Sequence, residues 1–144
     1  MPTYNSPIAT KAPFGHGLSG NVKGYFTEVT FAAAPTTADP INFFKVPAGF
    51  RVLGAILEAS DMDTHASPTI TLNIGDSGSA TRLFSASTVA QAGTSAVATA
   101  VTGIFHQYTT ETTITGVAQA NATAGASGTL RLCVYGLLED SATS

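Results

Sequence analysis

Residues 69–78 read Thr-Ile-Thr-Leu-Asn-Ile-Gly-Asp-Ser-Gly, and this stretch decides the fold class. Ile70, Leu72 and Ile74 alternate with polar residues, which places the three apolar side chains on one face of a strand. Gly75–Gly78 then supplies the turn residues that end such a strand. A half-buried strand closed by a tight turn is typical of antiparallel β-structure.

Short apolar segments separated by turn residues continue on both sides of this stretch. The predicted strands are Val22–Phe31, Ile41–Val46, Phe50–Ala59, Thr69–Ile74, Ala80–Phe84, Ala96–Phe105, Tyr108–Val117 and Thr129–Leu138. About seven or eight short strands without long helical patterns indicate an all-β domain, an antiparallel β-sandwich of jelly-roll-like type. Small residues at 121–128 predict a hairpin loop before the last strand.

The segment Phe50–Ala59 is apolar on both of its faces. Strand alternation places Phe50, Val52 and Ile56 on one side, and Leu53 and Leu57 on the other. A strand of this kind is predicted to lie centrally, buried between two layers.

The chain divides into three zones. Residues 1–20 are predicted to form an extended N-terminal arm, because prolines recur there without any apolar period. Residues 21–138 form the single β-sandwich domain, and residues 139–144 form a polar C-terminal tail. The arm carries large apolar side chains, namely Tyr4, Ile8, Phe14 and Leu18. We therefore predict that the arm docks on a neighbouring subunit or on a partner surface.

The composition of the 144 residues excludes several classes of protein. Charged residues make up only 10% of the chain, and the net charge is −3. Six scattered Lys and Arg do not form the basic stripe of a nucleic-acid binder. No apolar run approaches the roughly 20 residues that span a bilayer, and residues 1–19 lack the pattern of a secretory signal. A single cysteine, Cys133, excludes an internal disulfide framework.

One segment has the residue types of a cation site. Asp61, Asp63 and His65 lie at alternate positions, and in an extended segment they share one side of the chain. Carboxylate and imidazole groups of this kind can hold a divalent cation. The segment lacks the glycine and the distal glutamate of a calcium loop, and Asp side chains in loops commonly bind local backbone. We treat the three residues as weak metal candidates and expect no bound metal or other cofactor.

The sequence contains no recognisable catalytic motif. It has no nucleophile elbow, and the glycine-rich turn at 75–78 is not followed by the helix that a phosphate site requires. His16, His65 and His106 stand in no pattern with a serine and a carboxylate. We predict that the protein is not an enzyme and binds no small-molecule substrate.

Several of these segments carry a resemblance to a known family. They are Ile41–Gly49, Arg51–Leu53, Ser67–Asp76, Thr81–Phe84 and Thr110–Gly116. Together they resemble small structural proteins of tailed bacteriophages, in particular head decoration (cement) proteins with sandwich or jelly-roll bodies. The resemblance covers about residues 40–138 and leaves residues 1–39 outside it.

The resemblance implies a virion protein on the capsid exterior. Such a protein binds the expanded head, commonly as a homotrimer, and stabilises it by bridging subunits of the major capsid protein. The expected partner contacts are Tyr4, Ile8, Phe14, Leu18, Phe43 and Phe44, with at least one of the two adjacent phenylalanines also expected in the core. Neither nucleic acid nor membrane is an expected partner.

Two other functions remain open from the sequence. A head-fibre domain, or another receptor- or glycan-binding β-module of the virion, would expose a binding groove at its loop edge. The absence of Trp weakens the glycan reading, because sugars often stack on aromatic platforms. A small hydrolase would need His65 or His106 gathered with carboxylates in a concave site.

Overall fold

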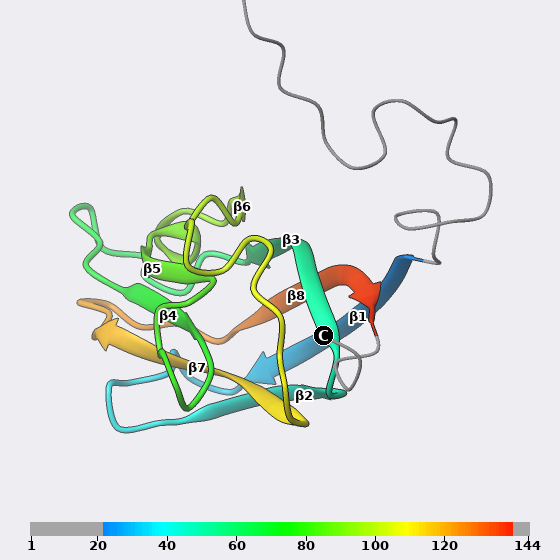
Figure 1. Cartoon of the computed structure of the whole chain (residues 1–144). Coiled ribbons are helices and arrows are strands. Elements are labelled where there is room, and N and C mark those ends of the chain that lie inside the picture. Colours follow the sequence, from blue (N-terminus) through cyan, green and yellow to red (C-terminus); the bar gives the residue numbers. More distant parts are fainter. Residues whose placement is uncertain (1–21, 140–144) are drawn as a thin grey trace, which may run out of the picture.

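Two four-stranded antiparallel sheets pack face to face in the computed structural model, which describes residues 22–139 (Figure 1). Sheet A has the strand order β1-β8-β3-β6, and sheet B has the order β2-β7-β4-β5. The strands are β1 (Val22–Phe31), β2 (Ile41–Val46), β3 (Phe50–Ala59), β4 (Thr71–Gly75), β5 (Phe84–Ser87), β6 (Ser95–Val97), β7 (Thr112–Ala120) and β8 (Gly128–Leu138). A short 3-10 helix, η2 (Val89–Gln91), precedes β6.

The strand order is that of a jelly roll. Along the described chain, β4 and β5 are the only consecutive strands that pair with each other, and every other connection crosses between the sheets. The predicted β-sandwich of jelly-roll type is therefore confirmed. The hairpin predicted at 121–128 is wrong, because β7 lies in sheet B and β8 in sheet A, so this loop bridges the two layers.

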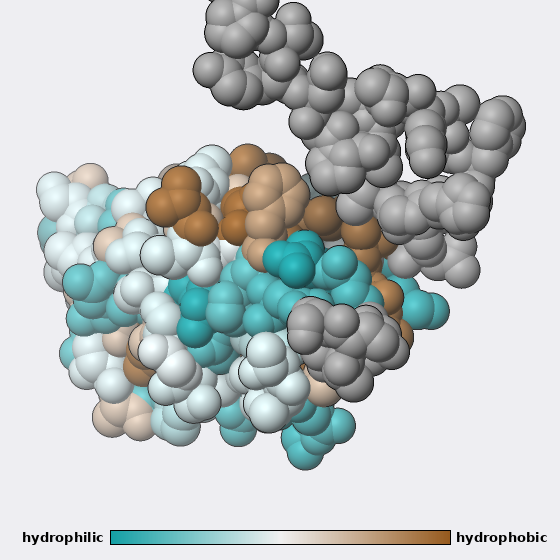
Figure 2. Space-filling model, in the orientation of Figure 1, coloured by the Kyte–Doolittle hydropathy of each residue, from teal (hydrophilic) through white to brown (hydrophobic). Residues whose placement is uncertain are grey.

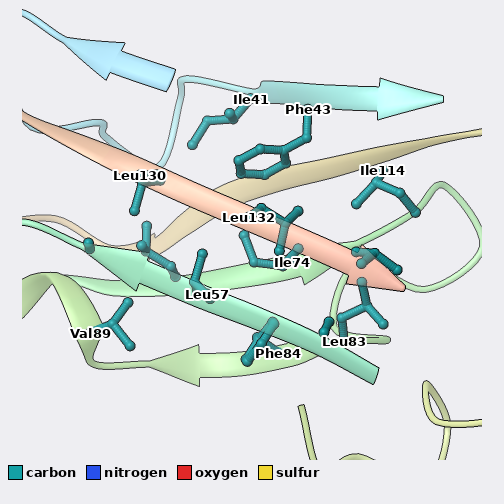
Figure 3. Close-up of a cluster of buried hydrophobic side chains, with 14 of the residues drawn as sticks. Ile41, Phe43, Leu57, Ile74, Leu83, Phe84, Val89, Ile114, Leu130 and Leu132 are labelled. Carbon is teal, nitrogen blue, oxygen red and sulfur yellow. The ribbon is translucent and has the colours of Figure 1, made fainter. Parts of the chain in front are cut away.

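The hydrophobic core fills the space between the sheets (Figure 3). Leu130, Leu132 and Val134 of β8 point inward, as their alternation predicts, and each is fully buried. They meet Ile74 and Ile114 from the opposite sheet in the same cluster. Large branched side chains interdigitating between two layers give such a sandwich most of its stability.

Several of the predicted strands begin or end elsewhere. The segment Ala80–Phe84 is mainly a loop, and its strand β5 starts only at Phe84. Ala96–Phe105 contributes a strand only through β6, after which the chain forms turns around Gly103 and continues as a loop to β7. The strands β4 and β7 begin and end one to four residues later than predicted.

The β3 strand differs from its prediction in a way that matters for function. A register shift between Val52 and Gly54 reverses the alternation, so Ala55 and Leu57 face the core and Ile56 faces outward. Ile56 is 42% exposed, so the prediction of burial on both faces is wrong for the single chain. A two-layer sandwich has no third layer, and an apolar outer face of β3 is therefore left uncovered.

No helix within residues 22–139 has the length and apolar character needed to cross a membrane.

Candidate functional site

The two outer faces of the sandwich differ sharply in chemistry. Large hydrophobic residues that are exposed within residues 22–139 all lie in strands of sheet A or in the loop after β6. They are Val22, Phe26, Ile56, Val97, Val101, Phe105, Tyr135 and Leu138. Figure 2 shows hydrophobic surface gathered around the position that β6 has in Figure 1, while the front of the molecule is white and teal.

An apolar row crosses sheet A from edge to edge. Phe26 of β1 pairs with Cys133 of β8, Cys133 pairs with Ile56 of β3, and Ile56 pairs with Val97 of β6. Residues directly opposite each other on neighbouring strands point to the same side of the sheet. Phe26 is 66% exposed and Val97 is 64% exposed. We call these four residues the apolar row.

A charged row lies directly beside the apolar row. Arg131 of β8 donates from Nε to Glu28 of β1 at 2.7 Å and from Nη1 to Glu58 of β3 at 3.0 Å. The hydrogen bond that Arg131 donates to Glu28 and the two carboxylate charges raise the pKa of Arg131. The set of three carries a net charge of −1 and is exposed, so it adds little stability to the body. Its fixed geometry suits recognition of a partner instead.

The two rows enclose a shallow hollow on the outer face of sheet A. Its volume is about 380 Å³, and its lining residues are Phe26, Glu28, Ile56, Glu58, Arg131 and Cys133. On the far side of the apolar row, the Tyr135 ring lies over Gly54, where any Cβ would overlap the ring. The outer face of sheet A is thus apolar at its centre and polar at its rim, the arrangement found in protein–protein interfaces.

An exposed aromatic side chain lies in the loop that continues from β6. Phe105 has a φ of 67°, a left-handed conformation that a bulky residue rarely adopts, and its side chain is 63% exposed. Two hydrogen bonds hold it there, from its N–H to the Val52 carbonyl at 2.7 Å and from Arg51 Nη1 to its carbonyl at 2.8 Å. Arg51 is itself paired with Glu139, the first residue of the predicted tail. Strain retained at an exposed residue points to a functional constraint.

The outer face of sheet B is polar. A groove of about 560 Å³ runs over β7 and β4, and its lining includes the hydroxyl-bearing residues Thr112, Thr113 and Thr115 of β7. No aromatic side chain lines it. Threonine gives a strand face hydroxyl groups that bind water, and it has a high β-propensity. This explains how the body stays polar here with so few charges.

The predicted metal candidates form a loop-organising centre. Asp63 is 1% exposed, and its carboxylate accepts the N–H groups of Thr69, Ile70, Thr123 and Ala124 at 2.7 to 3.2 Å. Burial would raise the pKa of Asp63, but these N–H groups outweigh it and hold the pKa far below its usual value. The carboxylate therefore joins the loop after β3 to the loop between β7 and β8.

Asp61 and His65 serve the same loop. Asp61 accepts the N–H of Asp63 at 3.0 Å, and the His65 ring bonds to the backbone of Ser67. Among residues 22–139 there is no group of three or more His, Cys, Asp or Glu side chains placed to hold a metal ion.

A second polar cluster lies at the other end of the body. Arg82 donates to Asp76 at 2.5 Å, Tyr108 donates its hydroxyl to the same carboxylate at 2.9 Å, and Arg82 Nη1 contacts His106 Nδ1 at 3.3 Å. Burial, and then the cation of Arg82, lower the pKa of His106, which favours the neutral ring that can accept this hydrogen bond.

This cluster does not have the arrangement of a catalytic site. Arg82 lies between His106 and Asp76, and both oxygens of Asp76 are already bonded to Arg82, Tyr108, Gly78 and Ser79. Burial would raise the pKa of Asp76, but Arg82 and Tyr108 lower it further, so the carboxylate stays charged. The cluster joins the loop after β4 to the loop before β7.

Protonation of His106 in this cluster should lower the folding stability in acid. The pKa of His106 is lower in the folded chain than its unfolded value near 6.5, so the unfolded chain binds the proton more readily. The stability is complete above about pH 6.5 and is lost as the pH falls below it. Urea unfolding between pH 7.5 and 5 (at least about one pH unit on each side of the unfolded pKa of His) should show this loss in the natural chain and not in His106→Gln. Equal pH profiles for both chains would contradict it.

The predicted partner contacts fall in two groups. Tyr4, Ile8, Phe14 and Leu18 lie outside the described residues. Phe43 is a core residue and not an exposed contact, because it is 8% exposed and packs in the central cluster. Phe44 is half-buried and stacks on Tyr25 with ring centroids 5.7 Å apart.

Sequence reasoning missed the apolar row. The alternation of β8 alone places Cys133 and Tyr135 opposite the core, and β3 signalled an apolar outer side. The missing information was the strand order, which brings Phe26, Ile56 and Val97 into line across the sheet.

Solved structures with the same fold include chains of phage capsids. A chain of the cyanophage Pam1 capsid asymmetric unit is 48% identical, with a TM-score of 0.81, and the match covers 96% of this chain and 99% of that chain. A chain of the capsid of Ralstonia phage GP4 is 27% identical, with a TM-score of 0.76, over 92% and 94% of the two chains.

More distant matches add only the fold. A chain from the acid-stable capsid of Helicobacter pylori bacteriophage KHP30 is 14% identical with a TM-score of 0.58, over 81% of this chain and 89% of that chain. No family model matches the sequence, and a search of curated proteins gave no match.

A jelly-roll body with one apolar outer face, matched along its length by chains of phage capsids, defines a bacteriophage structural protein. More particularly, the chain belongs to the family of the Pam1 capsid protein that it matches over nearly the full length of both. The resemblance to phage structural proteins predicted from the sequence is confirmed.

Proposed function

We propose that the protein is a decoration (cement) protein that binds the outside of the expanded phage head and stabilises it by bridging capsid subunits. The observation that carries the proposal is the contrast between the two sheets. The outer face of sheet A offers an apolar row with a charged rim, and that of sheet B offers threonine hydroxyls. A protein bound to a shell needs one face for its neighbours and one face for water.

The charge distribution supports a position of the protein on the exterior of the capsid shell. Four of the basic side chains in the body, Lys45, Arg51, Arg82 and Arg131, are paired with carboxylates. A surface against packaged DNA would need cations directed at phosphates. The net charge of −3 also disfavours the interior of a filled head.

Bridging would come from many weak contacts repeated by symmetry. A homotrimer presents the same surface three times around its axis, once from each copy. Modest contacts therefore add up through avidity. The major capsid protein is the proposed partner, and no catalytic step is required.

The test uses expanded heads that lack this protein. Purified protein should saturate the heads at a fixed ratio to the major capsid protein and raise the temperature at which they release DNA. Deleting residues 1–20 should weaken this binding while the body keeps its thermal unfolding transition. Heads that bind the full chain without a fixed ratio, or gain no heat resistance, would contradict the decoration role.

A further inference from the structure

We propose that residues 1–21 of one copy pack across the outer face of sheet A of a neighbouring copy, with the apolar row as their binding surface. The inference rests on the proposed function and assigns to its subunit contacts a specific surface and a specific occupant.

The chemistry of the face matches the chemistry of the arm. The apolar row is exposed at Phe26, Ile56 and Val97, and the charged row beside it has a net charge of −1. Residues 1–21 contain no Asp or Glu, one lysine, Lys11, and one histidine, His16. Apolar side chains with an adjacent cation therefore face apolar residues with an adjacent net negative charge, which is the complementarity expected of a docked segment.

The length of the arm favours a second copy over the same copy. The apolar row spans three interstrand spacings, about 14 Å. Tyr4 and Leu18 are separated by 14 residues, which reach about 46 Å when extended. An arm that only folded back onto its own row would use its last few residues and leave Tyr4 and Ile8 beyond the face.

The same length is enough to reach a neighbour. A compact body of residues 22–139 has a radius of gyration of about 13 Å, so it measures roughly 35 Å across. Ile8 precedes Val22, the first residue of β1, by 14 residues, which again extend about 46 Å. An arm leaving β1 can therefore lie across an adjacent body.

The match to the Pam1 capsid chain extends into the arm. That match covers 96% of this chain, which is more than residues 22–139 and a five-residue tail supply together. The capsid chain therefore has counterparts of most arm residues. A contact from the arm of one copy to the face of the next is head-to-tail, and such contacts close into a ring when the rotation allows.

Cys133 provides a direct probe of the face. It is the only cysteine of the chain, it is partly exposed, and it lies within the apolar row. The rate at which a thiol reagent labels Cys133 therefore measures whether the row is covered. In the full chain, without any capsid present, labelling should slow as the protein concentration rises, in step with the mass measured by sedimentation.

A complementation experiment identifies the occupant. One full-length variant carries serine in place of Tyr4, Ile8, Phe14 and Leu18, so its face is intact and its arm is not. The other carries Phe26→Asp, Ile56→Asp and Cys133→Ser, so its arm is intact and its face gives no thiol signal. Each alone should be monomeric, and adding the second in excess should slow labelling of the first by about tenfold or more.

Three outcomes overturn the inference. Labelling that is slow at every concentration while sedimentation shows a monomer would place the arm on its own copy. Labelling that is fast at every concentration would leave the face open, and a mixture that labels as fast as the first variant alone would exclude the arm as occupant. The measurement on the natural chain remains decisive if a variant does not fold. Capsids are absent throughout, so failure here is distinct from failure of head binding.

Discussion

Asp63→Ala is expected to lower the melting temperature of this protein more than any other single replacement of a charged residue. The carboxylate is buried and accepts N–H groups of Thr69, Ile70, Thr123 and Ala124, from two loops far apart in the sequence. Removing it leaves buried donors without partners, which costs far more than the loss of an exposed hydrogen bond. Thermal unfolding followed by circular dichroism measures the effect.

Asp39→Ala is the matched control for this variant. Asp39 also accepts a backbone N–H, from Thr36 at 2.9 Å, but it lies in an exposed turn. The control should change the melting temperature only slightly. Equal losses for the two variants would show that Asp63 does not organise the loops.

Asp63 should also give the chain an acid transition of its own, at lower pH than the transition of His106. The pKa of Asp63 is far lower in the folded chain than its unfolded value near 3.9, so protonation favours the unfolded chain. The stabilisation is complete above about pH 4 and is lost as the pH falls toward the folded value. Asp63→Asn, which keeps the size of the side chain, should remove this part of the pH dependence and lower the stability at pH 7 (well above the unfolded pKa).

The sequence was enough to predict the strands whose bounds follow from a local pattern of apolar residues. β1, β2 and β3 lie where runs of apolar, aromatic and β-branched residues stand between turn-rich segments, and their bounds agree with the prediction. Alternation also predicted which side chains of β8 point inward. These features are local, because each is set by the period of one strand and the turn after it.

The remaining features depend on contacts between distant segments. The bulge in β3 reverses its faces through pairing with β8, and Arg82, which forms an ion pair with Asp76, lies in a loop where a strand was predicted. The buried role of Asp63 needs partners up to 61 residues away. No single segment signals such contacts, so the residue types left a metal site open as a weak candidate beside a loop whose Asp side chains bind local backbone.

Charging the apolar row is the change expected to reduce head binding most, because it removes the contact between neighbouring copies on which the avidity of head binding depends. Phe26→Asp together with Ile56→Asp places two carboxylates at the centre of the outer face of sheet A, beside Glu28 and Glu58. Anchor residues at the centre of an interface contribute about 2 kcal/mol or more each. That corresponds to about thirtyfold in affinity per residue, and the added desolvation of each carboxylate increases the loss. Binding to expanded heads that lack the protein, measured by sedimentation with the heads, gives the affinity.

The opposite face offers a control with the same change in charge. Thr113→Asp together with Thr115→Asp adds two carboxylates to β7 on the outer side of sheet B, among hydroxyl groups that are already solvated. Both double variants replace outward-facing residues, so both bodies should keep their unfolding transition. If sheet A meets the neighbours and sheet B meets water, only the sheet A variant loses head binding. Loss only in the sheet B variant would reverse the assignment, because the hydroxyl face would then be the one that the neighbours cover, and equal loss in both would contradict the difference between the two faces.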